Sequence, residues 1–149
     1  RMSDGIAVFY DGSFYAYDEK TTDAADLFSR GAYQTFTFGP TMLSNATLKV
    51  SPSSEVDAYL ASNQRAGIGI IEPLHYVFVV SDGRTDESAG LSLYQFAELF
   101  DSLGCTDAYN LDGGGSATMC FMGKVINVPT PDGVNIVERK VSDCVYIGY

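Results

Sequence analysis

The stretch YNLDGGGSATM contains the residues best suited to chemistry, because Asp112 is followed by Gly113, Gly114, Gly115 and Ser116. Each glycine loses extra conformational entropy on ordering, so three in a row are a costly way merely to turn the chain. Glycines can adopt positive φ and expose successive backbone N–H groups, which suit an anion or sugar hydroxyls. We therefore predict that the Asp112 carboxylate and this loop face a substrate. The alternative is a tight strand connection that carries a solvated aspartate.

Several familiar catalytic loops do not fit this stretch. A phosphate-binding P-loop needs a lysine before the serine and a helix after it, and neither pattern is present. A nucleophile elbow requires a glycine where Thr118 stands. The single histidine, His75, is far along the chain from Ser116, which disfavours a Ser-His-Asp triad. No glutamate follows Asp112 at the spacing of an EF-hand loop, and we expect neither a metal nor a cofactor.

Two arginines and a second aspartate are further candidates for anion binding. The apolar run YVFVV and Ser81 are followed by Asp82, Gly83 and Arg84, and loops at strand ends often carry functional sites. The planar guanidinium of Arg84 can bind a phosphate or a carboxylate through two parallel hydrogen bonds. Arg65, in SNQRAGIGI, stands at the entrance of another apolar strand and could point into a cleft. A surface ion pair is the plainer interpretation of Arg65.

Strands are predicted on both sides of these loops. Two strands flank Asp11-Gly12 in IAVFYDGSFYAY, and AGIGII pairs with HYVFVV across Glu72-Pro73-Leu74, with His75 at the strand edge. Alternating or clustered apolar residues predict further strands in YQTFTFG, NATLKV, TDAYNL, ATMCF and VINV, and a closing strand in DCVYIGY. The fold class that follows is α+β, with a mixed, largely antiparallel sheet and a few short helices.

Two helices have clear start and stop signals. TTDAADLFSRG begins with Thr22 or Asp23 and ends before Gly31. In SLYQFAELFDSLG, Ser92 and Gln95 match a capping box and Gly104 ends the helix. An apolar stripe predicted to face the core consists of Leu93, Phe96, Ala97, Phe100 and Leu103.

Composition limits the classes of partner. The 149 residues suit one domain, residues 1–149, and carry a formal net charge of −10, which disfavours nucleic acid and anionic membranes. No apolar run approaches the roughly 18 residues of a membrane-spanning helix, so we expect no membrane insertion. Cys105, Cys120 and Cys144 form no CxxC motif and are predicted to be buried free thiols.

Four blocks of the chain together resemble the phosphodiester glycosidase family. They are NQRAGIGI, VFVVSDGRTDESAGLSLYQFAELFDSLGCTDAYNLDGGGSATM, GKVINVPT and ERKVSDCVYIGY, and the likeness runs from about residue 33 to the C-terminus. The combination of R-x-x-x-G, D-G-R, N-L-D-G-G-G-S and V-x-N is specific, although each piece alone is weak. Ala117 stands where many members of the family have a second serine.

The resemblance implies hydrolysis of a sugar-1-phosphodiester. It places around the site Asp112, Asp82, Arg84 and Arg65, which we expect to be catalytic, and Asn110, Gly113, Gly114, Gly115, Ser116, Gly83 and Asn127, which we expect to contact the substrate. We also expect Gly39 to contact the substrate. Gly39 belongs to TFTFGP, whose Thr37 and Pro40 match the same family segment. We expect the arginines to bind the phosphodiester, and Asp112 to stabilise an oxocarbenium-like centre or to activate water, with Asp82 as its partner.

One feature of the family pattern is missing from this sequence. Members carry an upstream Asn-Gly segment followed by aromatic residues, and nothing before Ile6 supplies it. The chain therefore resembles the C-terminal portion of the family's domain, and we expect it to associate with itself or with an upstream segment. The resemblance also implies an extracellular or cell-surface location and a link to bacterial exopolysaccharides. A non-catalytic module that binds phosphorylated cell-surface glycans remains the alternative.

Overall fold

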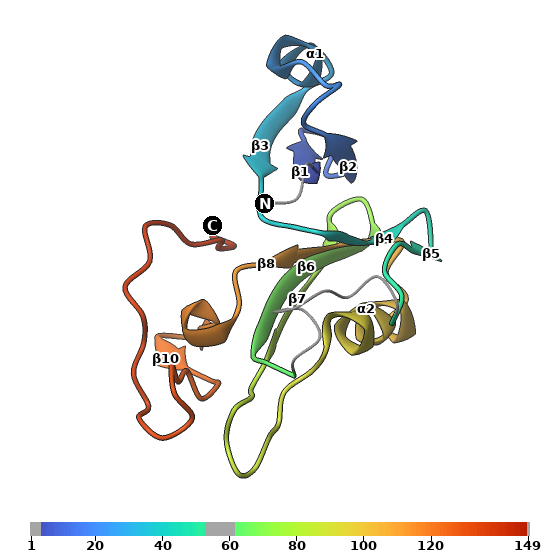
Figure 1. The fold of residues 1–149 in the computed structure, drawn as a ribbon. Helices are drawn as coiled ribbons and strands as arrows, with labels where there is room; N and C mark the ends of the chain where they lie inside the picture. Colours follow the sequence, from blue (N-terminus) through green and yellow to red (C-terminus); the bar gives the residue numbers. More distant parts are fainter. Residues whose placement is uncertain (1–3, 53–61, 149) are drawn as a thin grey trace.

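A five-stranded antiparallel sheet, in the order β5-β4-β8-β6-β7, carries the candidate site residues (Figure 1). The computed structural model describes residues 4–52 and 62–148 of the chain. The strands of this sheet are β4 (Thr41–Ser44), β5 (Thr47–Leu48), β6 (Arg65–Glu72), β7 (His75–Ser81) and β8 (Asp107–Leu111). The predicted pairing of AGIGII with HYVFVV is confirmed as β6 and β7, and exposed His75 begins the edge strand β7.

A smaller sheet precedes it in the chain, in the order β2-β1-β3. Its strands are β1 (Asp4–Phe9), β2 (Phe14–Asp18) and β3 (Ala32–Phe36), and the helix α1 spans Ala24–Ser29. The predicted hairpin at Asp11-Gly12 is confirmed: Gly12 has a φ of 83°, and the Asp11 carboxylate accepts hydrogen bonds from the amide and hydroxyl of Ser13. The side chain of Asp23 caps α1 at its N-terminus. Gly31 follows the helix with a φ of 90°.

Apolar clusters join these elements into layers. Ile6, Val8 and Phe14 of the small sheet pack against Ile68, Ile70 and Tyr109 of the large sheet. The opposite face of the large sheet packs against the helix α2, which spans Leu93–Ser102. Leu27 of α1 covers the outer face of the small sheet. The order of layers is therefore α1, small sheet, large sheet and α2, as Figure 1 shows.

Helix α2 confirms most of the signals read from the sequence. Ser92 and Gln95 form the predicted capping box, and Gly104 follows with a φ of 81°. A Cβ at Gly69 would lie only 2.7 Å from the Phe100 ring, so the glycine lets the helix approach β6 closely. The prediction for Leu103 is wrong, because 44% of this residue is exposed where the helix ends.

The strands of the C-terminal third differ from the prediction. ATMCF and VINV contribute only the two-residue strands β9 (Cys120–Phe121) and β10 (Lys124–Val125). A short 3₁₀ helix, η2 (Gly114–Ser116), lies within the glycine loop. The predicted strand DCVYIGY is not formed within residues 143–148, because a strand pattern needs a neighbouring ladder and none of the described segments supplies one there. Strand β4 was not predicted, and NATLKV forms only β5.

No helix among the residues described here is long and apolar enough to cross a bilayer.

The three cysteines are free, but only Cys105 is buried, so the prediction of buried thiols is wrong for Cys120 and Cys144. Cys105 packs in the cluster beneath α2, and its burial raises the pKa of its thiol to about 11.

The cysteines provide a test of this packing. Because the thiolate is the reactive form, we expect Cys120 and Cys144 to react with an aromatic disulfide reagent at pH 8, and Cys105 to react only after unfolding in urea. Raising the pH toward 11 should increase the intrinsic reactivity of Cys105. A count of the thiols released with time measures this, and rapid reaction of all three at pH 8 would contradict the packing.

Candidate active site

The register of three strands brings the sequence-predicted loops to one edge of the large sheet. Arg65, the first residue of β6, pairs with Ser81 at the end of β7. Ala66 pairs with Leu111 at the end of β8. Since both neighbours run antiparallel to β6, Asp82 and Asp112 leave the sheet on either side of the residue where β6 begins. The structure thus brings together the two loops that the sequence predicted separately.

The glycine loop is seated on the backbone that leads into β6. The amide of Gly114 donates a hydrogen bond of 2.9 Å to the carbonyl oxygen of Gln64. A Cβ at Gly113 would lie 2.5 Å from the same oxygen, which no side chain tolerates. Gly114 itself has a φ of 55°, in the left-handed region that favours glycine. The loop therefore needs two of its glycines for this close contact.

Contrary to the prediction from the sequence, the loop does not present a run of free N–H donors. Its second half is the 3₁₀ turn η2, in which the Ser116 amide donates to Gly113 and the Ala117 amide to Gly114, each at 3.1 Å. With the Gly114 amide bonded to Gln64, three of the loop's amides are engaged within the protein. What the loop offers is a side-chain-free surface rather than a continuous anion nest.

Arg84 lies beside this bare surface. A Cβ at Gly114 would be 3.8 Å from Nη2 of Arg84, so the guanidinium and the glycine loop are neighbours. Nη1 donates a hydrogen bond of 2.9 Å to the carbonyl oxygen of Pro131, and Arg84 is exposed to solvent. The backbone of Arg84 has a φ of 62°. Gly133 lies against it, because a Cβ at Gly133 would be only 1.9 Å from the carbonyl oxygen of Arg84. The segment around residues 131–133 therefore holds this arginine at the loop.

Asp82 anchors the next segment of the site. Its Oδ1 accepts a hydrogen bond of 2.7 Å from the Val128 amide and one of 3.4 Å from Nδ2 of Asn127. Asn127 also donates to the Ala117 carbonyl and accepts from the Met119 amide, each at 2.8 Å. Asn127 therefore links the C-terminal end of the glycine loop to Asp82.

Gly83 and Arg65 pack into the base of the site. A Cβ at Gly83 would lie 2.8 Å from the amide nitrogen of Gln64, so the loop after β7 also packs closely against the chain that leads into β6. Arg65 is only 5% exposed, and its Nε donates a hydrogen bond of 3.1 Å to the carbonyl of Leu91. Arg65 is thus a buried cation at the base, whereas Arg84 is the exposed one.

Asn110 and Gly39 meet beside β8. Nδ2 of Asn110 donates a hydrogen bond of 2.8 Å to the carbonyl of Gly39, which precedes a cis bond to Pro40 and has a φ of 87°. Two buried side-chain oxygens in the described part of the chain have no hydrogen-bond partner, Oδ1 of Asn110 and Oε1 of Gln64. A buried acceptor without a partner is costly, and such groups often belong to sites that bind a ligand or a water.

The Asp112 carboxylate remains available for chemistry. Asp112 follows β8 directly, is exposed, and takes part in no hydrogen bond recorded among the described residues. Asp112 and Arg84 therefore stand on the two loops that meet at the bare glycine surface.

Three residues that contact the site were not predicted from the sequence. Gln64 supports the glycine loop through its carbonyl and donates through Nε2 to Val128 at 3.2 Å. Pro131 accepts the hydrogen bond from Arg84. Arg139 donates a hydrogen bond of 3.2 Å to Oγ of Ser116, so this predicted substrate contact is already paired. Gln64 and Arg139 lie in two blocks that carry the family resemblance, NQRAGIGI and ERKVSDCVYIGY, whereas Pro131 gave no signal in the sequence.

Comparison with known proteins identifies the family of this chain. Residues 3–148 match the phosphodiester glycosidase family, and the chain belongs to that family. An SPbeta prophage-derived uncharacterized protein of Bacillus subtilis, YomE, is 32% identical over 147 residues, which are 99% of this chain and 22% of that protein.

Solved structures share the fold at lower identity. The zebrafish N-acetylglucosamine-1-phosphodiester α-N-acetylglucosaminidase catalytic domain, auto-inhibited by its pro-peptide, matches with a TM-score of 0.71 and 21% identity, over 94% of this chain and 50% of that chain. A Burkholderia pseudomallei protein described as exported matches with a TM-score of 0.57 and 21% identity, over 93% of this chain and 38% of that chain. The present chain therefore spans half or less of these relatives.

The Asp82 anchor can be tested without an activity assay. Replacing Asp82 with alanine removes the acceptor of the Val128 amide, and we expect a loss of about 1–3 kcal/mol in the free energy of unfolding. Asp82→Asn keeps an oxygen at this position and should lose less. Hydrogen exchange at the Val128 amide should accelerate in Asp82→Ala and stay slower in Asp82→Asn. Equal protection in wild type and Asp82→Ala would rule out the anchor.

Proposed function

We propose that this protein hydrolyses a sugar-1-phosphodiester and releases the sugar from its phosphate-linked partner. The observation that carries the proposal is the meeting of the exposed Arg84 guanidinium with the glycine loop that follows Asp112, 3.8 Å from the Cβ position of Gly114. Family membership supports the reaction class. At Gly114 a Cβ would meet no atom closer than 3.8 Å, which leaves room for a sugar or a phosphate oxygen close to the main chain.

The proposed roles follow from how exposed each group is. Arg84 binds the phosphodiester and stabilises the charge that grows on the leaving phosphate, because its guanidinium faces solvent while remaining fixed by Pro131. Asp112 stabilises the oxocarbenium-like carbon or activates the attacking water. Water adds its oxygen to the anomeric carbon as the bond from that carbon to the phosphate oxygen breaks. A phosphate monoester is a good leaving group, so it needs less protonation than an alcohol.

The remaining predicted residues support this pair. The buried Arg65 contributes positive charge from the base of the site, since a cation in a low-dielectric environment acts over a longer range than an exposed one. Asp82 and Asn127 fix the segment that carries Pro131, and through it the position of Arg84. Asn110 and Gly39 hold the strand that delivers Asp112. We therefore assign Asp82 primarily a positioning role rather than that of a second catalytic carboxylate.

A binding module for phosphorylated cell-surface glycans is the second candidate. It is favoured by the engagement of Asp82, because glycosidases generally use two carboxylates and Oδ1 of this one is bonded to the Val128 amide and Asn127. Such a module would bind a glycosyl phosphate tightly and leave it intact. The structural similarity to a protein described as exported is consistent with an extracellular substrate for either function.

The catalytic proposal predicts distinct effects of two substitutions on the hydrolysis of N-acetylglucosamine-1-phosphodiesters. Asp112→Asn should lower kcat about 100-fold or more, and Arg84→Ala should lower kcat/KM about 100-fold, with Arg84→Lys intermediate. The matched control is Asp101→Asn, an exposed carboxylate at the end of α2, which should leave both parameters unchanged.

The kinetic parameters separate the competing roles. If Arg84→Ala raises KM alone, the arginine binds the substrate without stabilising the transition state. Calorimetry that finds binding of the intact phosphodiester, together with product analysis that finds no turnover, would support the binding module. Full activity in both Asp112→Asn and Arg84→Ala would overturn the proposed mechanism.

A further inference from the structure

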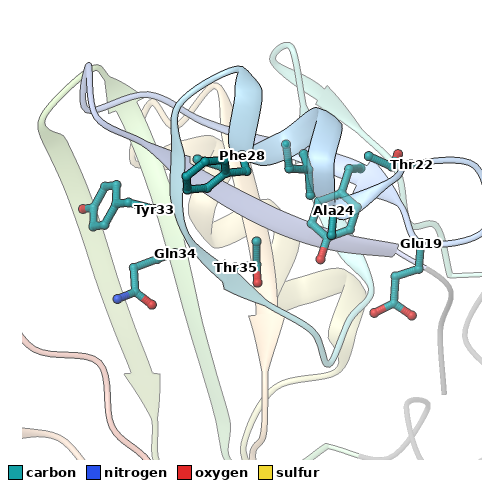
Figure 2. Close-up of a pocket in the computed structure, with 10 residues that line it drawn as sticks. Glu19, Thr22, Ala24, Phe28, Tyr33, Gln34 and Thr35 are labelled. Atoms are coloured by element: carbon teal, nitrogen blue, oxygen red, sulfur yellow. The ribbon is translucent and has the colours of Figure 1, made fainter.

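A hollow lies on the small sheet and shares no lining residue with the candidate active site. It is bounded by α1, by the segment that precedes this helix, and by β2 and β3, and its volume is about 620 Å³ (Figure 2). Sites for small molecules commonly have volumes of about 300–1,000 Å³. In Figure 2, Phe28, Tyr33 and Gln34 lie toward one end of the hollow, and Thr22 and Glu19 lie toward the other.

Aromatic side chains at this hollow are exposed without serving the core. Leu27, only 6% exposed, already anchors α1 to the sheet, whereas the adjacent Phe28 is 77% exposed. Tyr33 is 50% exposed and stacks against Tyr10, with ring centroids 5.2 Å apart. Single exposed apolar residues are ordinary, but large rings gathered at a concave surface are typical of binding sites.

The third ring, that of Tyr17, is held against the sheet. Gly5 and Tyr17 are register partners on β1 and β2, and a Cβ at Gly5 would lie 2.7 Å from Cζ and from Oη of the tyrosine. The ring therefore occupies the space that a side chain at Gly5 would fill. An aromatic surface fixed in this way costs little entropy when a ligand packs on it.

The polar residues of the hollow indicate the kind of ligand. Glu19, Thr22, Gln34 and Thr35 provide carboxylate, hydroxyl and amide groups, and the described residues that line the hollow include no lysine or arginine. Such a lining offers hydrogen bonds to hydroxyl groups and no positive charge for a phosphate. A protein partner would need a contact of about 800 Å² on each side, larger than a hollow of this size provides.

We propose that this hollow is a binding site for neutral saccharide units, distinct from the phosphodiester site. The C–H faces of a pyranose pack on the rings of Tyr17, Phe28 and Tyr33, and its hydroxyl groups bond to the polar side chains at the rim. This site needs no hydrolysis and stands whether the protein is an enzyme or a binding module. It would hold an uncharged part of a glycan while the glycine loop engages a phosphorylated part.

Titration with two neutral tetrasaccharides, one of β-1,4-linked N-acetylglucosamine and one of α-1,4-linked glucose, tests the proposal. NMR shift changes should cluster on α1 and β3 for at least one of them. Phe28→Ala and Tyr33→Ala should each weaken its binding at least about fivefold. The matched controls are Phe121→Ala and Tyr146→Ala, because these rings are 65% and 80% exposed but lie far along the chain from the hollow. Both controls should bind as wild type does.

Three results of the binding experiments would overturn the proposal. They are the absence of binding to both tetrasaccharides, shift changes confined to the glycine loop, and equal affinity in the Phe28 and Tyr33 variants when circular dichroism shows them folded. Self-association that disappears in Phe28→Ala would instead identify the hollow as a protein contact and would also overturn it. Because the readout is binding and not turnover, failure here is separate from failure of the proposed hydrolysis.

Discussion

The carbonyl oxygen of Gln64 is the contact on which the candidate site depends. It accepts the Gly114 amide at 2.9 Å and leaves no space for a Cβ at Gly113, so the chain after β8 must pass directly over the start of β6. The loop after β7 packs closely against the same backbone at Gly83. Two loops that are about thirty residues apart in the sequence are thereby fixed on one short segment, and this brings Arg84 beside the bare glycine surface. The triple glycine is best explained by this close approach of three chain segments.

Some residues of the candidate site are bonded within the protein and support its geometry, whereas others are exposed to solvent. Asp82, Asn127 and Ser116 are bonded to protein groups, which places them in the frame of the site. Asp112 and Arg84 remain exposed, so they are the groups that a substrate can reach. The same division occurs in the small sheet, where Leu27 secures α1 and Phe28 remains outside the core. In both places the residues exposed to solvent are those suited to a ligand: a carboxylate and a guanidinium at the glycine loop, and aromatic rings on the small sheet.

Local signals predicted elements well, and contacts between distant segments were predicted poorly. Ser92, Gln95 and Gly104 set the limits of α2 because capping depends on adjacent residues alone. Strand β4 escaped prediction because its pairing with β8 joins residues far apart in the chain. The prediction of an anion nest is wrong partly for the same reason, since the Gly114 amide is bonded to the carbonyl of Gln64, about fifty residues upstream. The residue pattern alone predicted Asp112, the glycine loop, Asp82, Arg84 and Arg65, and the family resemblance added Asn110, Asn127 and Gly39. Their division into supporting and available groups required the geometry.

The most direct test of the central claim is which bond breaks when a sugar-1-phosphodiester is hydrolysed in ¹⁸O-labelled water. Attack at the anomeric carbon, with Arg84 holding the phosphate as a leaving group, predicts that the released phosphate monoester contains no ¹⁸O and shows no isotopic shift in its ³¹P NMR signal. Incorporation of ¹⁸O into the phosphate would show attack at phosphorus. That result would contradict a site in which an exposed aspartate serves the sugar and an arginine serves the departing phosphate.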